Sequence, residues 1–161
     1  MTRVAKKEGH DIRIDKEAIW YFQGRVMERQ DIVRHLYQYL RIDSTGRYVI
    51  ETEDDRCHIT VDDVPFVIRS VDSGVSQDSG RPCILLSLSD GSREELNLDI
   101  PFWHGEENAL YCRVKNGAYA ARFSRPSYYQ LCGFIEYNAA HGIYMITVND
   151  ISYPLAFADQ P

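Results

Sequence analysis

Apolar and polar residues alternate with a period of two along most of the chain, a pattern typical of half-buried β-strands. The alternating segments come in pairs around short polar turns, and Asn116-Gly117 gives the strongest hairpin signal among these turns. The predicted hairpins are 18–22 with 25–27, 48–52 with 56–61, 83–88 with 94–98, 110–115 with 118–123, and 143–148 with 151–155. The chain is therefore expected to fold largely as antiparallel sheet.

The apolar pattern changes to a helical period in two places. From Arg29 onward, Ile32 and Leu36 recur with the spacing of one helix face, which predicts a helix of about three turns. A second helix is expected after Ser124, because serine caps helix N-termini and Pro126 would stand where no hydrogen bond is lost. Each predicted helix follows one hairpin and precedes another.

The order hairpin, arginine, helix, glycine, hairpin thus occurs twice. An offset of 96 residues carries Arg29 onto Arg125 and Gly46 onto Gly142. An internal repeat explains this register, and the alternative is two unrelated strand-helix-strand units that share common turn residues. The predicted fold class is α+β, with two related units, each an antiparallel sheet plus a helix, joined by a central strand segment.

The same pattern divides the chain into segments. Residues 1–17 are expected to form an N-terminal tail with a short edge strand at 12–15. Residues 18–100 would hold the first strand-helix-strand unit and a central hairpin, and residues 109–161 the second unit. The segment 101–108 is the predicted linker because it contains proline, glycine and adjacent acids.

Composition narrows the class of protein. With 161 residues, of which 44% are hydrophobic, the chain can bury a sizeable core. A net charge of -6 argues against a nucleic-acid partner, and no apolar run reaches the ~20 residues of a membrane span. The start lacks the apolar stretch of a signal peptide, so we expect a cytoplasmic protein. The four cysteines are far apart without a CxxC pair, which predicts buried thiols, no metal and no cofactor.

Two adjacent acids and a proline interrupt the strand pattern midway along the chain. Asp62 and Asp63 end one alternating segment, and Pro65 removes a backbone donor just before Phe66 opens the next. The chain must turn or change sheets at this corner. We expect Phe66 to lie in the core and Asp63 to be held by backbone donors or by an arginine, with Arg125 the first choice.

The segment 59–66, with its Val-Asp-Asp-Val-Pro-Phe run, is the most specific part of a wider pattern. The other matching residues are Trp20, Gly24, Val26, Arg29, Ile32, Val33, Gly46, Arg47, Tyr48 and Arg125 to Tyr129. Together they resemble an uncharacterised bacterial family, domain of unknown function 1285, over residues 12–155. The chain departs from that family where Asp62 replaces an expected Glu and where Glu53-Asp54-Asp55 replaces a proline and apolar residues. The resemblance implies a mixed fold with two related halves, a suspected part in bacterial signal transduction, and no known activity.

Charged and aromatic residues near the helix starts and the acidic corner are candidates for a binding site. Arg29 and Arg125 stand where the helix dipole disfavours cations, so each could clamp an anion or bond loop carbonyls. The aromatic density of the second half could line a ligand cleft or a dimer surface. The candidate ligand-binding residues are Arg29, Asp62, Asp63, Arg122, Arg125, Tyr128 and Tyr129.

A catalytic constellation is not recognisable, since no serine has a Gly-x-Ser-x-Gly context and no histidine is positioned to activate one. We therefore predict a non-enzymatic binding or regulatory module, with a groove between its two halves edged by Asp62, Asp63, Arg125 and Tyr128. Its partner would be a small ligand or a protein, and the module could be a homodimer.

The alternative function is a metal-dependent hydrolase. The acidic turn of Glu53-Asp54-Asp55, together with Asp62 and Asp63, offers the oxygen ligands that Mg²⁺ and Ca²⁺ prefer. This alternative requires several of these carboxylates to converge on one point.

Overall fold

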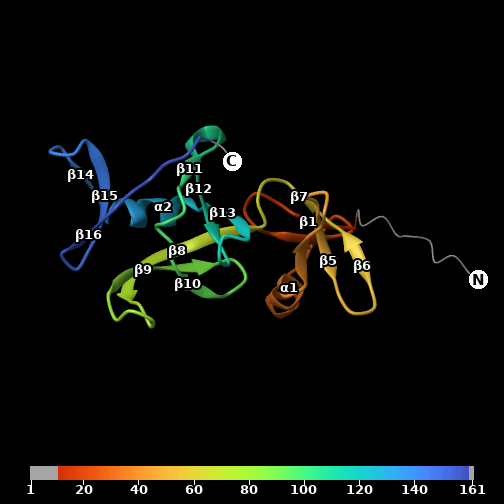
Figure 1. The fold of residues 1–161 in the computed structure, drawn as a ribbon. Coiled ribbons are helices and arrows are strands. Elements are labelled where there is room, and N and C mark those ends of the chain that lie inside the picture. Colours follow the sequence, from red (N-terminus) through yellow and green to blue (C-terminus); the bar gives the residue numbers. More distant parts are fainter. Residues whose placement is uncertain (1–10, 160–161) are drawn as a thin grey trace, which may run out of the picture. The chain divides into compact units, whose positions relative to one another are not determined.

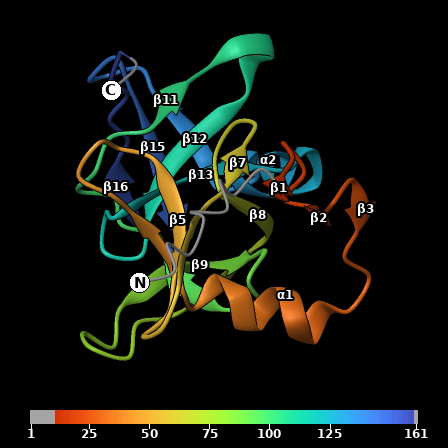
Figure 2. The same ribbon diagram turned by 90° about the vertical axis from the view of Figure 1, so that its right-hand side faces the viewer.

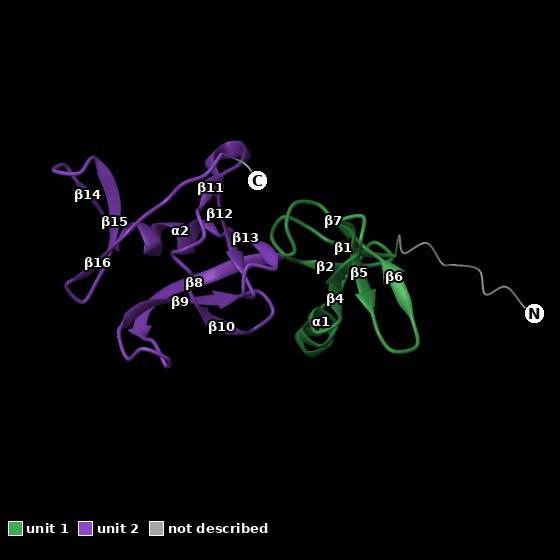
Figure 3. Cartoon of the chain, in the orientation of Figure 1, with its two compact units in different colours: residues 1–65 green, residues 66–161 purple. Residues whose placement is uncertain are grey.

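The computed structural model describes residues 11–159, and the chain divides into two compact units between Pro65 and Phe66. Unit 1 takes residues 1–65 and unit 2 takes residues 66–161 (Figure 3). Sheets dominate both units, and among the described residues each unit has one α-helix (Figure 1), which confirms the α+β class. Residues 1–10 of the predicted tail lie outside the described residues. Neither helix is long and apolar enough to cross a membrane.

Unit 1 opens with a four-stranded sheet. Its strands are β1 (Ile12–Ile14), β2 (Trp20–Phe22), β3 (Arg25–Val26) and β7 (Thr60–Val61), in the order β3-β2-β1-β7. The β2–β3 hairpin turns at Gln23 and Gly24, whose φ angles of 50° and 76° suit the predicted tight turn. β1, predicted at an edge, lies inside the sheet because it pairs with β2 on one side and parallel to β7 on the other.

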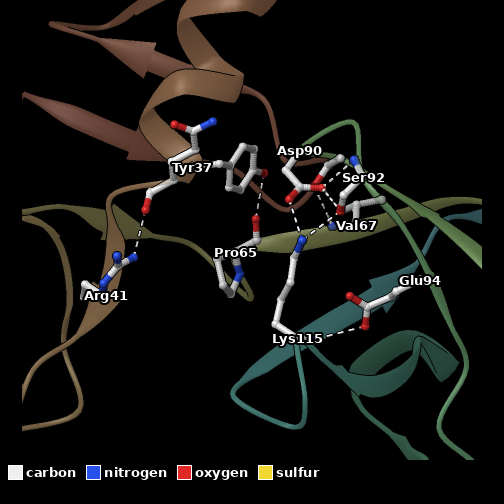
Figure 4. Close-up of polar contacts among 10 residues, drawn as sticks. Tyr37, Arg41, Pro65, Val67, Asp90, Ser92, Glu94 and Lys115 are labelled. Atoms are coloured by element: carbon white, nitrogen blue, oxygen red, sulfur yellow. Dashed lines mark hydrogen bonds and ion pairs between the residues drawn. The ribbon is translucent and has the colours of Figure 1, made fainter.

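A helix and a three-stranded antiparallel meander complete unit 1. These elements are α1 (Gln30–Tyr37), β4 (Leu40–Ile42), β5 (Tyr48–Glu51) and β6 (Arg56–His58). α1 is shorter than predicted because Leu40 pairs with Ile50 in the β4–β5 ladder. The buried Tyr37 ring meets Trp20 edge-on with centroids 4.8 Å apart, and its hydroxyl donates to the Pro65 carbonyl at 2.8 Å (Figure 4). Tyr37 thus fixes α1 both to β2 and to the 62–65 corner.

The corner of residues 62–65 leads the chain from one sheet into another. β7 belongs to the four-stranded sheet, whereas the next strand, β8 (Phe66–Val75), belongs to a six-stranded sheet. Phe66 and Ile68 are 2% and 0% exposed. The predicted change of sheet and the core position of Phe66 are both confirmed.

β8 lies inside the six-stranded sheet of unit 2. The other strands are β9 (Pro82–Leu88), β10 (Arg93–Glu95), β11 (Trp103–His104), β12 (Leu110–Val114) and β13 (Tyr119–Phe123), in the order β10-β9-β8-β13-β12-β11. β8 runs antiparallel to β9 and parallel to β13, which forms a hairpin with β12 (Figure 2). The segment expected as a linker, 101–108, instead supplies β11 and a short 3-10 helix, η1 (Glu106–Asn108), because Trp103 pairs with Tyr111.

The second helix and meander follow β13. They are α2 (Arg125–Cys132), β14 (Ile135–Asn138), β15 (Ile143–Val148) and β16 (Ile151–Pro154), with β15 in the middle. Ser124 caps α2 as predicted, accepting a hydrogen bond from the Ser127 N–H. The ladder between β8 and β9 shifts register after Ile68, and there the Val71 N–H donates to the Gln130 side-chain oxygen at 2.8 Å. The Gln130 side chain thereby joins α2 to β8.

Candidate functional site

An open groove of about 700 Å³ lies between the β2–β3 hairpin and the start of α1 in unit 1. Its lining residues are Phe22, Gln23, Arg25, Val26, Met27, Glu28, Arg29 and Ile32. Three of them are large apolar side chains that remain 46% (Phe22), 51% (Val26) and 38% (Ile32) exposed. Exposed apolar side chains gathered around a concave surface are typical of binding sites.

The local sequence explains why these side chains stay exposed. Trp20 and Phe22 share one face of β2, since alternate strand residues point the same way. Trp20 is covered by Tyr37 of α1, but Phe22 stands two residues further along the strand, beyond that contact. Ile32 precedes the buried Val33 on α1 and so lies at the flank of the helix's buried face. The groove therefore extends the unit 1 core outward to solvent.

Two arginines give the groove a cationic component. Arg29 donates to Asp31 through Nε at 3.2 Å and through Nη2 at 2.7 Å, and these bonds hold the pKa of Asp31 below its ordinary value. Arg25 is exposed and forms no ion pair with the residues described. Arg29, a candidate binding residue from the sequence, thus lines the groove. Arg25, Phe22 and Val26 were not among the candidate binding residues from the sequence.

Asp62 is bound by an arginine of β1. Arg13 Nε donates to both carboxylate oxygens of Asp62, at 2.9 and 3.0 Å, and Nη2 donates to one of them. These hydrogen bonds lower the pKa of Asp62 and raise that of Arg13. The arginine also lies over the Tyr21 ring, whose hydroxyl donates to Asp15. Asp62 is therefore an ion-pair partner that fixes the corner to β1.

The acidic turn does not converge on a metal position. The Asp55 carboxylate accepts a hydrogen bond from the Arg56 N–H at 2.8 Å, which is a local turn contact. Within residues 11–159, no group of three or more His, Cys, Asp or Glu side chains is placed to hold a metal ion. The convergence that the metal-dependent hydrolase requires is thus not found among the described carboxylates.

The remaining candidates lie in unit 2. Arg125 and Tyr129 are exposed on α2, and the Tyr128 and Tyr129 rings meet edge-on with centroids 5.8 Å apart. The neighbouring Cys132 raises the pKa of Tyr128. Arg122 stands on β13, opposite Tyr111 of β12. The seven candidates therefore fall into two sets, one in each unit, and the groove predicted between the halves stays a prediction, as does the pairing of Asp63 with Arg125.

Asp43 and His58, which were not among the candidates from the sequence, form a hydrogen bond across the first meander. Asp43 accepts hydrogen bonds from the Thr45 N–H, the Thr45 hydroxyl, the Arg47 N–H and His58 Nε2, the last at 2.8 Å. The bonds from Thr45 and then from His58 hold the pKa of Asp43 well below its ordinary value. Asp43 and His58 stand 15 residues apart, so their contact has no local signal in the sequence.

A second group of hydrogen-bonded polar side chains joins two turns of unit 2 (Figure 4). Lys115 Nζ donates to Asp90 Oδ2 and Ser92 Oγ, both at 2.7 Å, and the Lys115 N–H donates to Glu94 at 2.9 Å. Burial alone would raise the pKa of Asp90, but the hydrogen bonds from Lys115 and Ser92 outweigh it and lower that pKa. Lys115 therefore joins the turn at Asp90 and Ser92 to its own turn between β12 and β13.

Comparisons with known proteins agree with this fold. Residues 5–64 match the family described as domain of unknown function 1285 (DUF1285), N-terminal domain. A DUF1285 family protein from Silicibacter pomeroyi DSS-3 matches with a TM-score of 0.73 and 22% identity, over 94% of this chain and 82% of that one. A DUF1285 family protein from Shewanella baltica OS155 matches with a TM-score of 0.58 and 15% identity, over 77% of this chain and 91% of that one. None of the curated proteins matches the chain. The resemblance to DUF1285 is therefore confirmed, as a match of residues 5–64 to the N-terminal domain of that uncharacterised family and a likeness of fold to two of its proteins.

Proposed function

We propose that the chain is a non-enzymatic binding module whose ligand site is the groove of unit 1. The observation that carries the proposal is the gathering of Phe22, Val26 and Ile32, each more than a third exposed, around one open groove. Full burial of an apolar side chain of this size is worth about 1.5–3 kcal/mol, and at 38–51% exposure roughly half of that remains to be gained for each. A ligand that covers them recovers part of that free energy.

The ligand has an apolar body and an anionic group. Apolar side chains make up half of the residues that line the groove, and Arg25 and Arg29 line the same groove. A guanidinium recognises a carboxylate, phosphate or sulfonate through paired hydrogen bonds. Arg25 is the stronger anchor, because Arg29 already shares its guanidinium with Asp31.

A regulatory role in the bacterial cytoplasm follows from the family resemblance and the cysteines. The family pattern carries a suspected part in signal transduction, and a ligand-binding module without catalytic residues suits such a part. Cys57, Cys83, Cys112 and Cys132 are free thiols, as a reducing compartment favours.

We also propose that the two units share a duplicated helix-plus-meander element. α1 and α2 are both eight residues long, and each is followed after a two-residue gap by a three-stranded antiparallel meander. The ladder pair Leu40 and Ile50 corresponds to Ile135 and Ile146, at offsets of 95 and 96 residues. The offset changes by one because the turn between the first two strands is one residue longer in unit 2. At the offset of 95 residues Arg125 corresponds to Gln30, and no longer to Arg29 as the offset of 96 had it. Ser124, which caps α2, then corresponds to Arg29, the cap residue of α1.

The binding proposal is tested with 8-anilinonaphthalene-1-sulfonate, a dye that combines an apolar ring system with a sulfonate. The native chain is expected to enhance its fluorescence saturably, and Val26→Asp to weaken that binding about tenfold or more by placing a charge in the apolar lining. Ile143→Asp, at an exposed isoleucine of unit 2, is the matched control and should bind the dye as the native chain does. Equal dye binding by native chain and Val26→Asp would remove the groove as the ligand site.

The anionic part of the proposal has its own variant. Arg25→Gln should weaken binding of the sulfonate dye but leave binding of the uncharged dye Nile red unchanged, because only the first dye carries a group for a guanidinium. An equal loss of both dyes would mean that Arg25 shapes the groove and does not select an anion.

A further inference from the structure

The second meander leaves one edge strand open. In unit 2 the sheet order is β14-β15-β16, so β14 has a neighbour on one side within that sheet. The Thr147 N–H donates to the Phe134 carbonyl, and hydrogen-bonded pairs alternate along an antiparallel ladder. Glu136 and Asn138 therefore face β15 with their backbone groups, while Ile135 and Tyr137 present theirs to the open edge. The other edge strand, β16, ends in Pro154, which has no N–H to offer.

The corresponding edge in unit 1 is closed by a side chain. By the same alternation, the Leu40 carbonyl of β4 points away from β5, since the Glu51 N–H donates to the Tyr39 carbonyl. Arg41 Nη1 donates to this Leu40 carbonyl at 2.7 Å and to the Gln38 carbonyl at 2.9 Å. The residue of β14 at the position of Arg41 is Glu136, whose carboxylate has no donor for a carbonyl.

An aromatic pair stands directly beside the open edge. Tyr137 of β14 and Tyr144 of β15 are cross-strand partners with ring centroids 5.1 Å apart, and they are 59% and 52% exposed. They share the face that further along the strand buries Ile146. This face therefore continues from the core of unit 2 out to the open edge.

An antiparallel strand with an open edge is self-complementary, because a two-fold axis places its outward donors opposite its own outward acceptors. If Tyr137 faces Tyr137 of a second copy, both offer outward backbone groups and exchange two hydrogen bonds. Glu136 then stands opposite Asn138, whose amide can donate to the carboxylate. Moving the two-fold axis from Tyr137 to Glu136 would set Glu136 against Glu136, and like charges directly opposite each other are unfavourable.

We propose that β14 pairs antiparallel with β14 of a second copy of this chain about Tyr137, and that the tyrosines of both copies form one row. The row runs Tyr144, Tyr137, then Tyr137 and Tyr144 of the second copy, on one face of a continuous six-stranded sheet. β14 has four residues, so the interface is small and the dimer exchanges readily with monomer.

Disulfide trapping of the full chain tests both the contact and its register. In a Cys132→Ser background, Tyr137→Cys should form a covalent dimer under mild oxidation, because directly hydrogen-bonded partners have Cα atoms about 5.5 Å apart, within disulfide range. Glu136→Cys should give several-fold less dimer, because its opposite residue is Asn138. Thr147→Cys, on β15 of the same sheet, is the control for random collision. Equal trapping of Tyr137→Cys and Thr147→Cys, or preferred trapping of Glu136→Cys, would overturn the proposal.

Sedimentation of chains without added cysteines gives the second measurement. The native chain should show a weight-average mass that rises with concentration, and Glu136→Arg should remain monomeric over the same range. The arginine in that variant can cap the open carbonyls as Arg41 does on β4. A native chain that stays monomeric up to near-millimolar concentration, or an unaltered rise in Glu136→Arg, would contradict a β14 interface.

Discussion

The two helix-plus-meander elements follow the same path but use their surfaces differently. In β5 of unit 1, Val49 and Ile50 point to opposite faces, and both are buried, at 0% and 6% exposure. In β15 of unit 2, Ile146 and Val148 are buried on one face, while Tyr144 of the same face and Ile143 of the other are exposed. The same order of helix and meander thus contains a central strand buried on both faces in unit 1 and a central strand with exposed residues on both faces in unit 2. The same order of elements can therefore carry different surface residues, and these residues determine which other surfaces each meander can contact.

The first turns of the two meanders show which features the backbone requires and which are additions. The Asp43 side chain accepts from the Thr45 and Arg47 N–H groups, and the Asn138 side-chain oxygen accepts from the Ala140 and His141 N–H groups. Both turns therefore need a short side-chain acceptor at this position. The charge on Asp43 and its bond to His58 are specific to unit 1.

The largest expected effect comes from the central strands of the meanders. Ile50→Ala and Ile146→Ala should each lower the free energy of unfolding of the unit that holds it by about 2–4 kcal/mol, because each leaves a cavity at a buried ladder position. Chemical denaturation of the full chain measures both, with Ile143→Ala as an exposed control that should cost about 0.5 kcal/mol or less. A cost below 1 kcal/mol for Ile146→Ala alone would mean that the second meander is not packed as the first is.

A smaller effect, confined to acid, should separate the two turns. The pKa of Asp43 in the folded chain lies below its ordinary value of 3.8, so folding is favoured by the ionised carboxylate. The stability that it contributes is fully present above the ordinary value and is lost as the pH falls toward the folded value. Asp43→Asn keeps an acceptor for the Thr45 and Arg47 N–H groups but has no charge, so its stability should fall less steeply below pH 4.

Denaturation midpoints between pH 2 and pH 7 measure this difference between native chain and Asp43→Asn. Asn138→Asp supplies the matched control, because the Asn138 side chain accepts from the Ala140 and His141 backbone N–H groups and, among the described residues, from no imidazole. Parallel pH profiles for the native chain and Asp43→Asn would show that the charge of Asp43 does not stabilise unit 1.

The parts of the fold that the sequence predicts are those with local causes. Gln23-Gly24 and Asn116-Gly117 form the predicted turns because left-handed φ angles are decided within a few residues. β4 and β14 were missed because Leu40 and Ile135 also fit the apolar period of the preceding helix, and only pairing with Ile50 and Ile146 decides for a strand.

The candidate site was harder to predict than the fold. Arg29 lines the groove, but Phe22 and Val26 look like ordinary strand residues, and their exposure depends on where Tyr37 and Trp20 pack. Asp62 of the acidic corner was a candidate binding residue because it belongs to an unusual run of acids. In the structure, however, it forms an ion pair with Arg13 of β1. Contacts between residues far apart in the sequence produce no periodic pattern, so a single sequence does not predict them.

The smallest change in stability, with a distinct change in association, is expected at the closed edge of unit 1. Arg41→Glu removes the side chain that caps the Leu40 and Gln38 carbonyls and places at β4 the residue type that β14 carries. Arg41 is exposed, so the free energy of unfolding should change by about 0.5 kcal/mol or less. The opened edge stands beside Ile42, an exposed isoleucine, and should pair with other chains, so species larger than a dimer should appear in sedimentation. Arg47→Glu, an exposed arginine in the neighbouring turn, controls for the change in net charge. If Arg41→Glu and Arg47→Glu sediment alike, the arginine cap is not what keeps the β4 edge from pairing, and the contrast between the two edges loses its cause.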